Sequence, residues 1–134
     1  MNKCSSTSEG SSMRLVEFFV RGNPVPKQSY RALKSGGGYI EKDVRAWQER
    51  VSRSAGFEMQ GRAPSNHWIE VELDFVLQHN RRVDLDNLSK NVLDALKRVV
   101  YVDDSQIVHL ILHKHYGNAA GVYVLVSEVI NEEE

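Results

Sequence analysis

The chain has very little cysteine and no long hydrophobic run. Its 134 residues include one cysteine, Cys4, so no intrachain disulfide can form and a reducing compartment is expected. The longest apolar runs, such as 122–126, fall far short of the roughly 20 residues that a membrane-spanning helix needs. The serine-rich start lacks the apolar core of a secretory signal. We therefore expect a cytoplasmic protein that does not enter a membrane.

The chain also lacks an excess of positive charge, since its formal net charge is -1. Nucleic-acid binding usually depends on Lys and Arg side chains, so the total gives no support for it. The distribution is different: nine Lys or Arg and four acids lie between Arg21 and Arg62, and many other acids cluster in 132–134 and in two aspartate motifs. A basic half facing an acidic centre suits a metal-dependent nuclease. A solvated charged surface remains the simpler explanation of charge alone.

Length and composition predict one globular domain, because 134 residues with 41% hydrophobic and 26% charged content can bury a core. Residues 1–12 hold five serines and no apolar period, so we expect a flexible tail there. The folded domain is expected to span 13–130, followed by an acidic end at 131–134. No internal repeat is evident.

The hydrophobic periods predict an α/β (α+β) fold. Alternating apolar residues indicate strands at 15–20 and 68–77. Helical spacing indicates helices at 43–57 and from Asp86 to Val99. Segments 107–116 and 122–129, separated by a glycine-bounded turn, predict a C-terminal β-hairpin. The expected architecture is a mixed β-sheet with two main helices.

Two aspartate pairs flank the second predicted helix. Asp84 and Asp86 stand where a strand gives way to a helix, and Asp103 and Asp104 follow the helix. Carboxylate oxygens suit Mg²⁺, and four carboxylates close together would repel one another without a cation. The helix carries its C-terminal end away from Asp84, so the last loop must fold back for the pairs to meet. We expect Asp84, Asp86 and Asp104 to converge on one metal.

Lys90 lies four residues after Asp86 on the same helical face, where its ammonium could stabilise negative charge that develops in a reaction. An ordinary surface ion pair is the alternative, and for Asp94 with Arg98 we prefer that alternative. A calcium-binding loop is excluded, because Leu88 occupies the third ligand position and the required glycine is missing.

Three histidines, His109, His113 and His115, share one face of a predicted strand. This spacing could bind zinc, but exposed strand histidines are commoner.

Taken together, the aspartate motifs resemble the RusA family of Holliday-junction resolvases. The resemblance lies in three segments: 82–90 (RVDLDNLSK), 93–96 (LDAL) and 102–107 (VDDSQI). Two further segments agree, since 22–27 (GNPVPK) resembles the N-terminal turn of that family and 114–117 (KHYG) resembles its late strand ending. The resemblance covers roughly residues 15 to 129.

This resemblance implies a homodimeric, Mg²⁺-dependent endonuclease, with Mn²⁺ able to substitute, that binds four-way junction DNA and nicks two opposed strands symmetrically in recombination and repair. Carried over by position, Asp84, Asp86 and Asp104 are the metal-binding catalytic acids, Asp103 is an adjacent metal ligand and Lys90 is the functional lysine. The cations expected to contact DNA are Lys27, Arg31, Arg81, Arg82 and Lys114. Residues 28–31 (QSYR) replace a more basic, proline-containing stretch, which affects DNA contacts and not the chemistry.

Two other classes of function stay open. A non-catalytic module that binds DNA junctions is disfavoured by the intact acids and Lys90. A phosphohydrolase that acts on nucleotides is disfavoured by the basic N-terminal half and by the lack of a glycine-rich phosphate loop.

Overall fold

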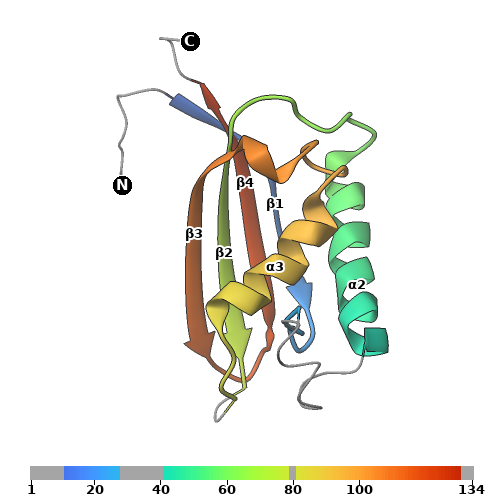
Figure 1. Ribbon diagram of the computed structural model, residues 1–134, viewed down its shortest axis with the longest axis vertical. Helices are drawn as coiled ribbons and strands as arrows, with labels where there is room; N and C mark the ends of the chain where they lie inside the picture. The colour runs from blue at the N-terminus through green and yellow to red at the C-terminus, as the bar shows by residue number, and fades with distance from the viewer. Residues whose placement is uncertain (1–10, 28–40, 79–80, 131–134) are drawn as a thin grey trace.

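A computed structural model describes residues 11–27, 41–78 and 81–130, and its strands form one four-stranded sheet (Figure 1). The strands are β1 (Ser11–Arg21), β2 (Ile69–Leu77), β3 (Ile107–Tyr116) and β4 (Gly121–Ile130). Their order across the sheet is β1-β4-β2-β3. β2 and β3 are parallel, whereas β4 is antiparallel to both β1 and β2. The predicted class and the mixed sheet are confirmed.

The two C-terminal strands follow each other through a short turn, as predicted, but they do not pair with each other. β2 lies between them and is hydrogen-bonded to both. The connection passes the end of β2, where the Gly117 N–H donates to the Leu77 carbonyl over 2.8 Å. β4 is therefore a central strand and not half of a directly paired hairpin, which explains why Val122, Val124 and Val126 are fully buried.

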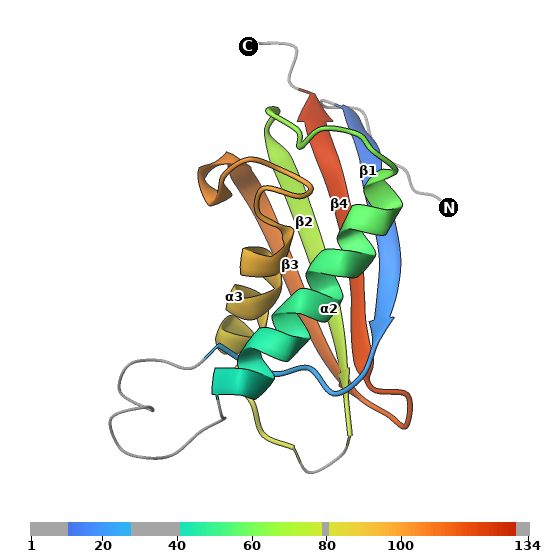
Figure 2. The same ribbon diagram turned by 90° about the vertical axis from the view of Figure 1, so that its right-hand side faces the viewer.

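Both helices cover one face of this sheet, and Figure 2 shows them in front of it. α2 (Glu41–Met59) lies against β1, and α3 (Leu85–Leu96) lies beside α2 and connects the parallel strands β2 and β3. Apolar residues at helical spacing turn one face of each helix toward the sheet. The buried residues are Trp47, Val51, Ala55 and Met59 in α2, with Leu88, Val92, Ala95 and Leu96 in α3.

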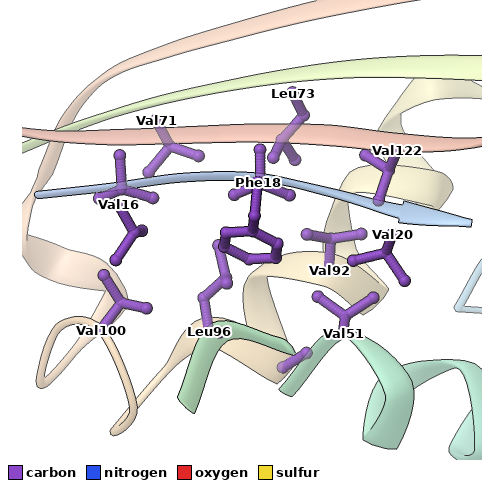
Figure 3. Close-up of a cluster of buried hydrophobic side chains, with 14 of the residues drawn as sticks. Val16, Phe18, Val20, Val51, Val71, Leu73, Val92, Leu96, Val100 and Val122 are labelled. Carbon is purple, nitrogen blue, oxygen red and sulfur yellow. The ribbon is translucent and has the colours of Figure 1, made fainter. Parts of the chain in front are cut away.

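The core lies between the helices and the sheet. Every second residue of β2 is buried, from Ile69 to Leu77, because successive strand side chains point to opposite faces. Figure 3 shows Phe18 of β1 pointing toward the helices, in the same buried cluster as Val51 of α2 and Leu96 of α3. Each fully buried side chain of this size contributes about 1.5 to 3 kcal/mol by leaving water.

Several boundaries differ from the sequence expectation. Ser11 and Ser12, assigned to the tail, belong to β1 and pair with Ile130 and Val129. Residues 1–10 and 131–134, which hold the rest of the expected tail and the acidic end, lie outside the described residues. In the part of the chain that the structure describes, neither helix is long and apolar enough to cross a membrane.

α3 ends three residues earlier than predicted. Arg98 adopts a left-handed backbone with φ of 70°, which interrupts a right-handed helix. The chain then folds back, and the Val100 N–H donates to the Leu96 carbonyl over 2.9 Å. Val100 and Tyr101 are fully buried, so tertiary packing sets the end of this helix.

Asn91 is a fully buried polar residue on α3. Its amide nitrogen donates to the carbonyls of Val25 (2.9 Å) and Val44 (3.2 Å), and its amide oxygen accepts from the Gln48 side chain at 3.1 Å. One side chain therefore joins α3 to α2 and to the segment that follows β1. Buried polar groups with partners stabilise a fold, and the same groups without partners destabilise it.

We predict that Asn91→Ala lowers the free energy of unfolding by about 2 to 3 kcal/mol, because two part-buried carbonyls and the Gln48 amide lose a hydrogen-bond partner. Urea denaturation followed by circular dichroism measures this change. Asn118→Ala is the matched control, because Asn118 is exposed, and surface changes usually stay within about 0.5 kcal/mol. Equal stability of the two variants would show that the Asn91 hydrogen bonds do not hold the two helices together.

Candidate active site

The first aspartate pair lies at the start of α3. Asp84 occupies the N-cap position with an extended backbone, yet its side chain makes no capping hydrogen bond. Asp86 lies in the first turn, and its side chain is 77% exposed. The positive end of the helix dipole favours anionic side chains here. Both carboxylates therefore remain available to a ligand at this end of the helix.

Contacts from two distant segments fix the position of this helix start. The Lys27 N–H donates to the Asn87 carbonyl over 2.9 Å, which holds the segment after β1 against α3. The Lys114 ammonium of β3 donates to the Val83 carbonyl over 2.9 Å. The backbone around the first pair is thus held from both sides.

Basic side chains surround this helix start. Lys90 lies 3.5 Å from Asp86, as the i,i+4 spacing predicts. Arg81 donates to the Pro24 carbonyl, and Arg82 is exposed. Lys27 forms an ion pair with Asp94 at 2.5 Å, so the predicted pairing of Asp94 with Arg98 is wrong. Arg31 lies outside the described residues. Four of the five cations expected to contact DNA therefore lie in segments that meet at the start of α3.

The second aspartate pair lies beyond the other end of α3. Asp103 caps a short 3-10 helix, η2 (Asp104–Gln106). Its side chain accepts from the Ser105 N–H at 3.0 Å, and the Gln106 side chain accepts from the Asp103 N–H at 2.7 Å. The hydrogen bonds from Ser105 and then the nearby Lys97 lower the pKa of Asp103 below its usual value. Asp103 is thus an ionised residue with a structural contact.

Asp104 is held near the C-terminal end of α3 by a buried tyrosine. The Tyr101 hydroxyl lies 3.1 Å from the Leu93 carbonyl and 3.3 Å from Asp104 Oδ1. Burial and then the Asp104 charge raise the pKa of Tyr101 above its usual value. The hydroxyl therefore stays protonated and can donate a hydrogen bond. This contact orients the Asp104 carboxylate.

α3 separates the two aspartate pairs within one chain, as Figure 1 shows for the two ends of this helix. Asp104 is linked to Leu93 through the Tyr101 hydroxyl. Leu93 lies about 10 Å from Asp86 along the helix axis, at about 1.5 Å per residue. One Mg²⁺ ion, which holds its ligands at about 2 Å, does not span this distance. Among the residues that the structure describes, no three acidic, histidine or cysteine side chains come close enough to hold a metal. The loop after α3 turns back only as far as Leu93, where buried Val100 and Tyr101 anchor it, so it does not carry Asp104 to the first pair within one chain.

The sequence analysis assigned no structural role to three residues that support the site: Asn91, Tyr101 and Gln106. Asn91 could have been noticed, because it interrupts the apolar face of a helix between Leu88 and Val92. Gln106 belongs to the segment 102–107 that carries the family resemblance, but its role as a link between loops could not be predicted. The partners of Tyr101 and Gln106 depend on how the loop after α3 packs.

The three histidines of β3 face acids of the neighbouring strand. His109 lies 3.2 Å from Glu70, His113 lies 3.3 Å from Glu72, and His115 lies 2.9 Å from Asp74. Each imidazole therefore has its own carboxylate partner across the sheet. This arrangement is a row of cross-strand pairs.

Comparison with known proteins adds independent information. A family model described as "Endodeoxyribonuclease RusA" matches residues 21–127. Over 100 residues, which are 73% of this chain and 78% of the relative, the chain is 26% identical to the crossover junction endodeoxyribonuclease RusA of Aquifex aeolicus (strain VF5). Over 54 residues, it is 41% identical to the uncharacterized protein YqaN of Bacillus subtilis (strain 168), covering 40% of this chain and 38% of that protein. Both aspartate pairs and Lys90 lie inside the family match.

Proposed function

Because the chain belongs to the RusA family of endodeoxyribonucleases, we propose that it resolves four-way DNA junctions by paired, symmetric nicks. We further propose that it needs Mg²⁺, acts as a homodimer and works in the cytoplasm. The start of α3 carries this proposal. There, Asp84 and Asp86 are exposed, Asp86 lies 3.5 Å from Lys90, and the backbone is held by two further lysines, Lys27 and Lys114.

The acidic side chains fit a hard divalent cation. Asp84 does not use its carboxylate as a helix cap, and Asp86 is largely exposed. Asp104 contributes a third carboxylate whose position is set by Tyr101. An all-oxygen set of this kind suits Mg²⁺, and Mn²⁺ accepts the same ligands. When bound, the ion would polarise the scissile phosphate and increase the acidity of a water molecule.

The chain's own cations have separate roles in this proposal. Lys90 is on the exposed side of α3, where its ammonium can stabilise negative charge on the reacting phosphate. Arg82 and Lys27 would hold neighbouring phosphates, because phosphate contacts position a protein on DNA. Asp103 is already engaged by Ser105, so we assign it mainly to the shape of the acidic loop.

The proposed dimer explains how separated acids can act together. β3 lies at the edge of the sheet and exposes four large apolar side chains, Val108, Leu110, Ile111 and Tyr116. Long apolar edge strands favour pairing with another strand. A second copy of β3 in antiparallel orientation would cover these side chains and extend the sheet across a two-fold axis.

The two-fold axis also has a consequence for the acids. It reverses the second copy, so the Asp103–Asp104 end of one subunit approaches the Asp84–Asp86 end of the other. Each of two equivalent sites would then combine Asp84 and Asp86 from one subunit with Asp104 from its partner. Two such sites match the two-fold symmetry of a junction that is cut twice.

We predict that the protein cuts a synthetic four-way junction in Mg²⁺ but not after chelation by EDTA. A linear duplex of the same sequence and free nucleoside triphosphates serve as matched substrates, and gel analysis of end-labelled strands gives the rates. Binding without cutting would identify a non-catalytic junction-binding module. Preferential hydrolysis of the nucleotides would identify a phosphohydrolase, and either result would refute the proposed activity.

The composite site predicts complementation between two inactive variants. Asp86→Asn and Asp104→Asn proteins, mixed under conditions that exchange subunits, should form heterodimers with one intact and one doubly altered site. About half of the dimers would be mixed, and each of these would have one intact active site out of two. The mixture should therefore regain about a quarter of the active sites of the wild-type protein. These dimers should make single nicks, which a plasmid carrying an extruded junction reports as open circles.

The matched control for complementation mixes Asp84→Asn with Asp86→Asn. Both changes lie at the same end of α3, so every site keeps at least one altered acid and activity should stay at the level of each variant alone. Sites formed within one chain would give no recovery from either mixture. That result would exclude the composite site and leave the junction assay above unaffected.

We predict that Lys90→Ala lowers the single-turnover cleavage rate by about 100-fold or more, which is the size of loss seen when one electrostatic donor is removed. Junction affinity should change little, because other cations hold the phosphates. Lys42→Ala is the matched control, since Lys42 is exposed on α2. A near-normal rate with saturating Lys90→Ala enzyme would reduce Lys90 to a surface ion pair.

A further inference from the structure

A surface hollow of about 730 Å³ lies next to the second aspartate pair. Trp68, Val129 and Ile130 give it apolar walls, and Asn66, His67 and Ser105 add polar groups. Ser105 directly follows Asp104 in the chain. Trp68 is 44% exposed, so its indole offers an aromatic surface to a molecule in the hollow.

The loop that carries Trp68 is tied to the acidic loop by Gln106. The Gln106 amide nitrogen donates to the carbonyls of Ser65 and His67, both over 2.8 Å. The Gln106 amide oxygen accepts from the backbone of Val102 at 2.8 Å and of Asp103 at 2.7 Å. A single side chain thus sets the distance between Trp68 and the aspartates.

Further contacts hold the same loop to β4. The Ser65 hydroxyl donates to Glu128 over 2.6 Å and accepts from the His67 N–H at 3.1 Å. The Trp68 carbonyl accepts from the Val129 N–H at 2.8 Å. The walls of the hollow are therefore ordered before any ligand arrives, which reduces the entropic cost of binding.

We infer that this hollow accepts one unstacked nucleobase of the junction, taken from a nucleotide beside the phosphate that is cut. Aromatic side chains bind unpaired bases by stacking, and adjacent polar groups bind base edges. Trp68 supplies the stacking surface, and Asn66, His67 and Ser105 supply donors and acceptors at the rim. The Gln106 amide is fully engaged, so it positions Trp68 and does not contact the base.

The location favours a base over other occupants. The hollow adjoins Asp104, which the proposed function places at the metal, so a nucleotide with its phosphate at that metal reaches the hollow with its own base. Removing a base from the stack costs least where its stacking or pairing is already disturbed, and the helical stack is interrupted where the strands of a four-way junction cross. This inference rests on the proposed function, and it makes Trp68 a determinant of the base at which the junction is cut.

A double-mutant cycle tests the inference by combining Trp68→Ala in the protein with removal of one base from the DNA. Junctions are made with an abasic site at each nucleotide that flanks the cut phosphate, one at a time. At one of these positions, Trp68→Ala on intact DNA and wild type on abasic DNA should each cut about tenfold more slowly. The two changes together should cost little more than either alone, because both remove the same stacking contact. Trp68→Phe should recover most of the rate on intact DNA.

Phe57→Ala is the matched control, because Phe57 is also an exposed aromatic, at 77%, and lies on α2. It should leave cleavage unchanged. Fully additive losses for Trp68→Ala and the abasic site at every position would overturn the inference while the proposed function stands. Loss of the dimer in Trp68→Ala, measured by analytical ultracentrifugation, would overturn it by assigning the hollow to a subunit contact.

A second measurement needs no cleavage and therefore separates the two proposals. The fluorescent base 2-aminopurine is placed at the same positions, and the complexes are formed without divalent metal. Its emission should be more strongly quenched by wild type than by Trp68→Ala at one position, since stacking on an indole quenches it. Equal quenching at all positions would refute the base site, even if the wild-type protein proved inactive on junctions.

Discussion

The hydrogen bonds of the buried Asn91 amide determine how the acid-bearing helix sits in this protein. They reach Val25 after β1 and Val44 and Gln48 on α2, so α3 can neither rotate nor slide without breaking them. With Asn91 turned inward, Asp86 and Lys90 remain on the exposed side of the same helix. Lys27, two residues after Val25, is brought to α3 by the same joint. The basic turn and the acidic helix start thus behave as one rigid unit.

The local structure of this chain could largely be predicted from its sequence, because it follows from side-chain periodicity. The alternation in 68–77 predicted β2 to within one residue, since every second side chain faces the core. The strand order could not be predicted in this way. Neighbouring strands in sequence usually pair, and β2 and β3 do so after α3 has crossed over the sheet. β3 and β4 do not pair, because β4 lies on the other side of β2. That choice depends on helix packing, which is a tertiary effect.

The local geometry of the first aspartate pair could be predicted from the sequence, but the arrangement of the two pairs could not. The spacing of Asp84, Asp86 and Lys90 fixes their common position at one helix end, because a helix start and an i,i+4 step are local features. The position of Asp104 depends on the buried Tyr101 and on an Arg98 backbone with positive φ. The bond from Lys114 to Val83 joins residues 31 positions apart in the sequence. No pattern along the chain specifies contacts of this kind.

The separation of the two aspartate pairs has an electrostatic benefit for the single subunit. Two carboxylates at 4 Å repel by roughly 1 kcal/mol in water and 4 kcal/mol near a protein surface, and the repulsion falls as their distance grows. With α3 between the pairs, the subunit can fold without a cation to offset that repulsion. In the proposed dimer, the carboxylates approach one another only across the subunit contact. A metal ion bound at the subunit contact would offset the repulsion between them. Cleavage would then be restricted to the assembled dimer that binds DNA.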